Sequence, residues 1–291
     1  MSDNNCILSQ SKPSPTSGGF ALSGKLRWLA TKTYPVERWQ GGVWQQAKDA
    51  VIEEAPVALF YNNVPHVVML ATPLDLEDFA LGFSLTEGII GSPSELNFVE
   101  AYHREDGIEL WMRIPPERFE QLSHKERNLT GRTGCGLCGS ATIAQAVRHP
   151  PPVGKGVSVT VEALRQALRS LEEHQILNKQ TGAVHGSAWV VPEKGIEFIR
   201  EDVGRHNALD KLIGALVKSG ADRDKGFVIV TSRASFEMVQ KCAMVGISLM
   251  VAISAPTGLA IRLAEETGLT LIGFARENRH TVYANSQRLV L

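Results

Sequence analysis

Residues 227–274 read FVIVTSRASFEMVQKCAMVGISLMVAISAPTGLAIRLAEETGLTLIGF, and this stretch decides the fold class. It contains three apolar runs without alternation, Phe227 to Val230, Leu249 to Ile253 and Leu269 to Phe274. Two segments with helical spacing separate the runs, Ser235 to Val245 and Leu259 to Glu266. Continuous apolar runs separated by helices are typical of buried parallel strands. We therefore predict an α/β fold in which helices cover both faces of a sheet.

The chain before residue 151 has a more mixed pattern. Asn62-Asn63 and Asp106-Gly107 each separate two β-rich runs and predict two hairpins. Thr72 and Pro73 predict the cap and first turn of the helix between the hairpins. We predict four parts: a disordered tail over 1–24, a smaller α+β subdomain over 25–128, a flexible cysteine loop with a short helix over 129–150, and an α/β domain over 151–291. In the last part, Thr160 should cap an amphipathic helix, and 187–191 with 196–200 should form a hairpin.

Composition excludes several classes of function. Thirty Lys and Arg residues against thirty-one Asp and Glu residues leave a formal charge of -1, which gives no sequence-wide attraction to nucleic acid or anionic lipid. No apolar run is long enough to span a bilayer, and the polar N-terminus lacks the basic start and apolar core of a secretion signal. We expect a cytoplasmic protein that binds neither nucleic acid nor membrane.

Two of the four cysteines, Cys135 and Cys138, lie close together in a nine-residue stretch with four glycines, Gly131 to Gly139. In a reducing compartment such a pair is more often catalytic, redox-active or metal-binding than structural. Two intervening residues let both sulfurs reach one atom, which suits zinc, an internal disulfide, or transfer of sulfur between the thiols. Arg132 and the start of a helix after Gly139 would lower the thiol pKa. We interpret the pair as reactive thiols.

Other interpretations of the cysteine pair have less support. Zinc would need further ligands, and no second cysteine pair exists; His185 and His206 are the remaining candidates. A thioredoxin-like pair would follow a strand and open a long helix. A zinc deaminase would need a His-x-Glu element and a proline where Gly134 stands. We therefore predict no resident metal, and we assign Cys6 to the tail and Cys242 to core packing.

Polar clusters follow each of the three predicted parallel strands. Ser232 and Arg233 follow the first strand, residues 254–258 the second, and Phe274, Ala275, Arg276, Glu277, Asn278 and Arg279 complete and follow the third. A further cluster, residues 201–207 with His206, lies at the start of a helix. Ligands of α/β sheets bind at the carboxyl ends of strands, where helix amides can face phosphates. The clusters predict a site for a phosphate-bearing ligand; the alternative is that they only cap helices and meet solvent.

The cysteine stretch resembles the signature of the FdhD family, the formate dehydrogenase accessory sulfurtransferases. Five further segments are similar to that family in the same order: 56–68, 79–90, Thr181-Gly182 with His185, 201–211 and 232–241. The resemblance covers the chain from about Ala55 to its end.

The resemblance implies a fold like that of cytidine deaminases, without their zinc site, in a homodimer. It also implies an enzyme that takes persulfide sulfur from a cysteine desulfurase and passes it to the molybdenum cofactor, in its bis(guanine dinucleotide) form, for formate dehydrogenase apo-enzyme. Cys135 would carry the persulfide and Cys138 would assist its transfer. Residues 274–279, with Ser232, Arg233 and His206, would bind the cofactor, which makes 151–291 a cofactor-binding domain. Two alternatives remain open, a non-catalytic maturation chaperone that binds the cofactor and a zinc-dependent nucleotide hydrolase.

Overall fold

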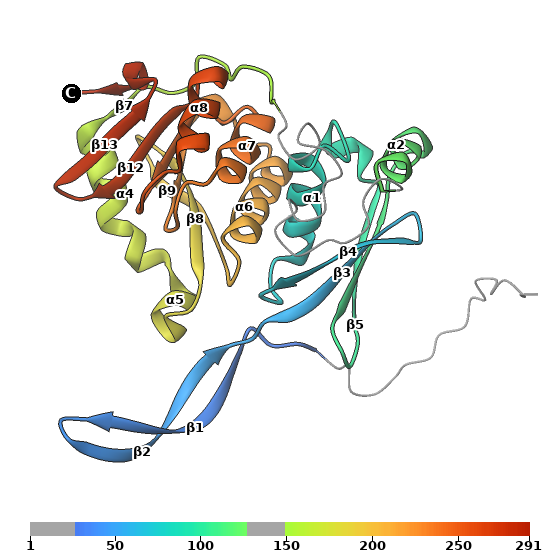
Figure 1. Cartoon of the computed structure of the whole chain (residues 1–291), viewed down its shortest axis with the longest axis vertical. Helices are drawn as coiled ribbons and strands as arrows, with labels where there is room; N and C mark the ends of the chain where they lie inside the picture. The colour runs from blue at the N-terminus through green and yellow to red at the C-terminus, as the bar shows by residue number, and fades with distance from the viewer. Residues whose placement is uncertain (1–26, 127–148) are drawn as a thin grey trace, which may run out of the picture.

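The computed structural model describes residues 27–126 and 149–291 and shows a mixed α/β fold (Figure 1). The first range contains β1 Thr31–Gln40, β2 Val43–Ile52, β3 Ala55–Tyr61, β4 Val64–Ala71, α1 Leu76–Thr86, η1 Pro93–Glu95, β5 Phe98–His103, β6 Ile108–Arg113 and α2 Pro116–Glu126. The second contains β7 Val159–Thr160, α4 Val161–His174, α5 Ile176–Thr181, β8 His185–Val191, β9 Gly195–Asp202, α6 Arg205–Ser219, η2 Arg223–Lys225, β10 Phe227–Val230, α7 Phe236–Met244, β11 Leu249–Ala252, α8 Gly258–Thr267, β12 Thr270–Arg276, β13 Arg279–Ala284, η3 Ser286–Arg288 and β14 Leu289–Val290.

The main sheet has six strands in the order β13-β12-β11-β10-β8-β9. Its centre is parallel, because β11 pairs in parallel with both β10 and β12, as the three apolar runs predict. The edges are antiparallel: β13 pairs with β12, and β8 pairs with β10 and with β9. The predicted hairpin over 187–191 and 196–200 is therefore present, and it makes the sheet mixed rather than wholly parallel.

Helices cover both faces of the main sheet, as predicted. Val228 and Val230 pack in one core cluster with residues of α6, α7 and α8. Phe227 and Ile229, whose side chains point to the opposite face, pack with Leu164 of α4. The Thr160 side chain caps α4 by accepting a hydrogen bond from the Ala163 amide at 3.1 Å, which confirms the predicted start of this helix.

The smaller sheet has the order β4-β3-β6-β5 and contains both predicted hairpins. Asn62 and Asn63 have φ values of 50° and 70°, the left-handed conformation of a type I′ turn. Helix α1 covers the inner face of this sheet, where Phe79 and Phe83 join Leu59 and Tyr61 in the core. The other face carries no helix among the described residues.

The predicted cap of α1 is wrong. The helix begins at Leu76, and its N-cap residue is Asp75, whose side chain makes no cap hydrogen bond. Thr72 instead joins a buried network: its amide donates to Asp202 Oδ2 at 3.0 Å, and its hydroxyl accepts from the Val203 amide at 3.2 Å. These long-range contacts take the place of the local capping bond.

Helices α1 and α6 pack side by side and join the two sheets. One hydrophobic cluster runs from β3 and α1 through α6 to β10, so the described residues share a continuous core across the predicted subdomain boundary. The likeness to cytidine deaminases and the exact limits of the four parts stay predictions. Within the described ranges, no helix combines the length and the apolar character that crossing a bilayer requires.

Candidate functional site

The loops after the three parallel strands form one hydrogen-bonded rim. Ala234 forms a parallel bridge with Pro256, and the Ala234 amide donates to the Ala255 carbonyl at 3.2 Å. The Phe274 amide donates to the Ser254 carbonyl at 3.1 Å. The three polar clusters that follow these strands in the sequence therefore lie together at the carboxyl edge of the sheet, where α/β proteins bind ligands.

The antiparallel strands bring the fourth cluster to the same edge. Val230, at the end of β10, pairs with Ser187, near the start of β8. His185 pairs in turn with Asp202, the last residue of β9, and α6 begins shortly after it at Arg205. The first turns of α6 and α7 thus both lie at this edge and present free amides there.

A buried ion pair fixes the start of α6. Lys211 Nζ lies 2.6 Å from Asp202 Oδ2, and both side chains are fully buried. Asp202 Oδ1 accepts hydrogen bonds from the Gly204 amide at 2.8 Å and from the Asn207 side chain at 3.0 Å. Asp202 and Asn207 therefore have a structural role, which is the alternative that the sequence left open for these two residues.

His206 is held neutral at this edge. Burial, followed by the charges of Arg205 and Lys241, lowers the pKa of His206 to about 3. Its Nε2 lies 3.3 Å from Glu237 Oε2, and burial raises the pKa of that carboxyl above its usual range. Because the imidazole is uncharged at neutral pH, this contact is not an ion pair. His206 and Glu237 together provide a polar wall at this edge.

Several buried polar atoms at the carboxyl edge have no hydrogen-bond partner among the described residues. They include Arg205 Nε, Ser235 Oγ and Ser187 Oγ. His206 Nε2 is among them because its 3.3 Å contact with Glu237 is not a hydrogen bond. Buried polar atoms are nearly always hydrogen-bonded in folded proteins. An edge with several polar atoms that lack a hydrogen-bond partner therefore suits a polar ligand. Ser235 is the N-cap residue of α7, but its hydroxyl makes no hydrogen bond to the amides of that helix.

A charge network lies behind this edge, between α1, α6 and α7. Lys241 Nζ lies 2.9 Å from Asp210 Oδ2 and 3.0 Å from Glu87 Oε1, and Thr86 Oγ1 donates to Asp210 Oδ1 at 2.7 Å. Burial opposes the charge of Lys241, but Asp210 and Glu87 outweigh it and hold the pKa of Lys241 above its usual value. The cation therefore stays protonated and adds to the forces that keep His206 neutral.

The predicted binding residues differ in how they face this edge. Phe274, Arg233, Asn278 and Arg279 are exposed, and Phe274 has a φ of 50°. Ser232 is buried and its hydroxyl donates to the Arg233 carbonyl at 3.1 Å. Ala275 is buried and can offer only backbone atoms.

Two further residues of this segment bond to their own surroundings. Arg276 Nη1 donates to the Ala275 carbonyl at 2.8 Å. Glu277 faces α4, where its Oε1 accepts from Arg169 Nε at 2.7 Å. Arg233 and Arg279 are exposed cations that a ligand at the edge could reach. From the sequence, Arg205 and Ser235 are not assigned to cofactor binding, although both residues belong to the polar clusters that follow the strands and open α6.

The predicted thiols Cys135 and Cys138, and Cys6, lie outside the described residues. Cys242 is fully buried in the core, and burial raises the pKa of its thiol to about 12, so it is an unreactive packing residue, as the sequence predicts. Residues 27–126 and 149–291 contain no group of three His, Cys, Asp or Glu side chains placed to hold a metal ion.

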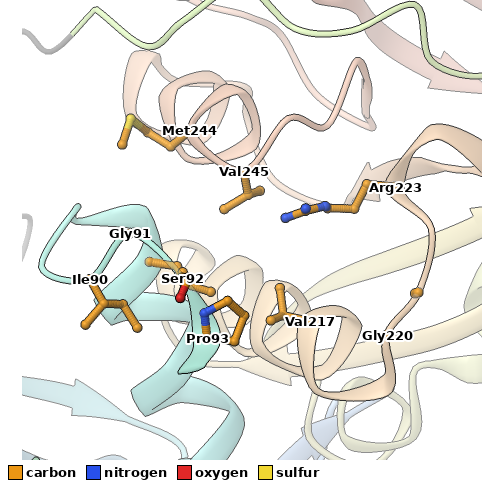
Figure 2. A pocket seen from close by; sticks show the side chains of 11 residues that line it. Ile90, Gly91, Ser92, Pro93, Val217, Gly220, Arg223, Met244 and Val245 are labelled. Atoms are coloured by element: carbon orange, nitrogen blue, oxygen red, sulfur yellow. The ribbon is translucent and has the colours of Figure 1, made fainter. Parts of the chain in front are cut away.

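A pocket of about 510 Å³ lies elsewhere, between α1 and the ends of α6 and α7 (Figure 2). Its walls are mainly aliphatic and include Val217, Met244 and Val245, and the Arg223 side chain extends toward it. The carboxyl ends of α6 and α7 lead into the amino ends of β10 and β11. This pocket therefore lies at the opposite edge of the sheet from the polar rim, and none of the predicted binding residues lines it.

The chain is similar to known proteins over nearly its whole length. It is 50% identical over 269 residues to the sulfur carrier protein FdhD of Cupriavidus necator, a match that covers 92% of this chain and 93% of the relative. It is 51% identical over 256 residues to the sulfur carrier protein FdhD of Xanthomonas euvesicatoria pv. vesicatoria, covering 88% and 91% of the two chains.

A solved structure has the same fold. The crystal structure of a protein assigned as a formate dehydrogenase accessory protein, from Desulfotalea psychrophila, matches with a TM-score of 0.73 and 23% identity, over 90% of this chain and all of that one. Residues 52–290 also match the model of the FdhD/NarQ family. On this evidence, the chain belongs to the FdhD/NarQ family.

Proposed function

We propose that this protein is a sulfurtransferase that carries sulfur during the maturation of formate dehydrogenase. The observation that carries the proposal is the 50% identity, over 92% of the chain, to a relative named as a sulfur carrier. The Cys135–Cys138 pair supplies thiols suited to that role. Cys242 does not compete for it, because its thiol is buried and protonated.

The first step loads the carrier. The Cys135 thiolate attacks the terminal sulfur of a persulfide on a cysteine desulfurase, the sulfur–sulfur bond of the donor breaks, and the donor cysteine leaves as a thiolate. In the second step the Cys138 thiolate attacks the inner sulfur of the Cys135 persulfide. A Cys135–Cys138 disulfide forms and hydrosulfide is released, so Cys138 provides the two electrons. A cellular dithiol reductant then restores both thiols.

The acceptor in the proposal is the molybdenum cofactor in its bis(guanine dinucleotide) form, bound as a substrate at the carboxyl edge. The fit rests on the unpartnered Arg205 Nε and Ser235 Oγ, on the exposed Arg233 and Arg279, and on the free amides at the starts of α6 and α7. Such groups suit phosphate oxygens and the polar edge of guanine. His206 would contact the ligand as a neutral ring.

The proposal places the protein in the cytoplasm, where thiols stay reduced, as a homodimer that meets both the desulfurase and the apo-dehydrogenase. Incubation with a desulfurase and cysteine, followed by mass spectrometry, should add one sulfur atom to the peptide that contains Cys135. If Cys135→Ala accepted sulfur and still restored formate dehydrogenase activity, the proposal would be wrong. Normal maturation by Cys135→Ala/Cys138→Ala would instead identify a non-catalytic, cofactor-binding chaperone.

A further inference from the structure

A long two-stranded arm extends from the body of the protein (Figure 1). Its strands β1 and β2 pair over ten positions, from Thr31↔Ile52 to Gln40↔Val43, and form a separate sheet. Most of its side chains are exposed on both faces. A two-stranded ribbon of this kind is at best marginally stable in water. Helix α5 contacts β2, but the side chains at the tip of the arm are left exposed.

The tip of the arm is aromatic. Trp39 and Trp44 face each other across the two strands, yet they are 60% and 68% exposed. Val43 beside them is 58% exposed. Large apolar side chains gathered at the end of an exposed ribbon mark an interaction site rather than an ordinary surface.

A second apolar surface lies on the outer face of the β4-β3-β6-β5 sheet. The strand register places Val68 and Leu70 of β4 on the same face as Phe60 of β3 and Trp111 of β6. Phe60 and Trp111 stack with their ring centroids 4.9 Å apart, and Tyr102 meets Trp111 edge-on. Val68 and Leu70 are 59% and 53% exposed.

Two carboxylates on this face are already bonded within it, and the Arg113 guanidinium lies over the Phe98 ring. Arg104 Nη2 lies 2.9 Å from Glu109 Oε2, which also accepts a hydrogen bond from Trp111 Nε1 at 3.1 Å. Tyr102 donates to Glu100. A face whose charges are paired internally favours an apolar partner over a charged one. The aromatic tip of the arm has that character.

The arm cannot cover the sheet of its own chain. Strand β2 continues through Glu53 and Glu54 into β3, and the arm extends from that point away from the rest of the sheet (Figure 1). With about 3.3 Å per residue, its ten pairs place the tip roughly 33 Å from the base. Each chain thus carries both halves of one contact, the arm and the outer face, but cannot join them within itself.

We propose that two copies of this chain exchange arms, so that Trp39 and Trp44 of each copy pack on the outer face of the other's smaller sheet. A contact in which each copy gives and receives the same element closes with two-fold symmetry. The outer face alone spans roughly 20 Å by 20 Å, an area of about 400 Å². A standard interface buries roughly 800 Å² on each partner, which is about twice this area. Two arm contacts per dimer supply the missing area.

This inference rests on the self-association part of the proposed function and is independent of sulfur transfer. Analytical ultracentrifugation of the full chain at micromolar concentration should show a dimer. Trp39→Ser/Trp44→Ser and, separately, Val68→Asp should each raise the dimer dissociation constant by a factor of at least about ten, with an unchanged circular dichroism spectrum. Val290→Ser, which removes an exposed apolar side chain elsewhere, should leave the dimer intact.

Photo-cross-linking locates the contact directly. A benzophenone amino acid at position 44, in a mixture of ¹⁴N- and ¹⁵N-labelled chains, should join position 44 of one chain to β4 or β6 of the other. A monomeric wild-type chain, dimers that survive both substitutions, or cross-links only within one chain would each overturn the inference. Persulfide formation on Cys135, measured in the same variants, reports separately on sulfur transfer.

Discussion

Gly82 of α1 lies directly against the backbone of Asp210 in α6. A β-carbon at position 82 would fall 1.7 Å from the Asp210 carbonyl oxygen, and one at Gly214 would fall 1.9 Å from the Asp78 carbonyl oxygen. The two helices therefore touch through glycines on both sides. Because α1 covers the smaller sheet and α6 covers the main one, this contact sets how the two sheets meet.

Replacement of Gly82 by alanine should strongly destabilise the protein. The atom that a methyl group would strike is backbone, so relief requires the helices to separate, and overpacking of this kind costs at least about 2 kcal/mol. Urea unfolding followed by circular dichroism measures the loss of stability. Gly258→Ala is the matched control, because its nearest neighbour is the end of the Arg262 side chain at 3.7 Å. Equal stability of the two variants would contradict the close α1–α6 contact.

The main sheet could be predicted because its signals are local. The run from Phe227 to Val230 is apolar at every position because both faces are covered, and this pattern is distinct from alternation. The arm could not be found in this way. Its residues alternate poorly, with Trp39 beside Arg38 and Lys48 between Ala47 and Asp49, because most of its side chains are exposed on both faces.

The candidate site was predictable as a location but not in its details. Parallel strands bring their carboxyl ends to one edge, so the convergence of 231–235 with 274–279 followed from the strand assignment alone. The direction of each side chain depends on tertiary structure. The β12–β13 pairing shifts register between Gly273 and Arg276, and Glu277 lies against Arg169. No local sequence pattern predicts the contact between Glu277 and Arg169.

Substitution of Lys241 by methionine should cost about 3–5 kcal/mol of stability, because it leaves the buried carboxylate of Asp210 and the partly exposed carboxylate of Glu87 without their cation. The matched control is Lys218→Met. Lys218 pairs with Glu77 at 3.0 Å on the surface, where such a pair contributes about 0–1 kcal/mol. Chemical denaturation at neutral pH compares the two variants, and a similar small loss in both would show that the Lys241 network is not needed for stability.

His206 should make the protein less stable in mild acid. The pKa of His206 is about 3 in the folded state, against the ordinary value of 6.5 that applies to the unfolded chain. Below pH 6.5 the unfolded chain therefore binds a proton at this histidine, whereas the folded chain does not. The contribution of His206 to the free energy of unfolding is therefore fully present above pH 6.5 and is lost as the pH decreases. The loss from this group is about 2 kcal/mol at pH 5. His206→Gln should flatten the difference between unfolding free energies at pH 7 and pH 5. The exposed His149→Gln should retain the wild-type difference, and an unchanged slope in His206→Gln would refute the assignment.

Arg205 should contribute directly to ligand affinity at the carboxyl edge. The probe is guanosine diphosphate, which carries the guanine and phosphates of the proposed substrate. Arg205→Met removes a guanidinium whose hydrogen bonds to a phosphate contribute about 1.5–3 kcal/mol, so calorimetry should show a loss of affinity of about tenfold or more. Arg223→Met, at the pocket on the opposite edge, should bind like the wild type. Equal loss in both variants would argue against a site at the carboxyl edge.

Substitutions of Cys135 and Cys138 should block different steps of sulfur transfer. Cys135→Ser should accept no sulfur, because the attacking thiolate is absent. Cys138→Ser should accept one sulfur atom on Cys135 but release hydrosulfide slowly, because no neighbouring thiol attacks the inner sulfur. Mass spectrometry follows loading, and a sulfide-trapping dye follows release in the absence of external thiols. Cys242→Ser is the control and should behave like the wild type in both assays, since its thiol is buried. Rapid release from Cys138→Ser would show that Cys138 is not the thiol that displaces hydrosulfide from the Cys135 persulfide.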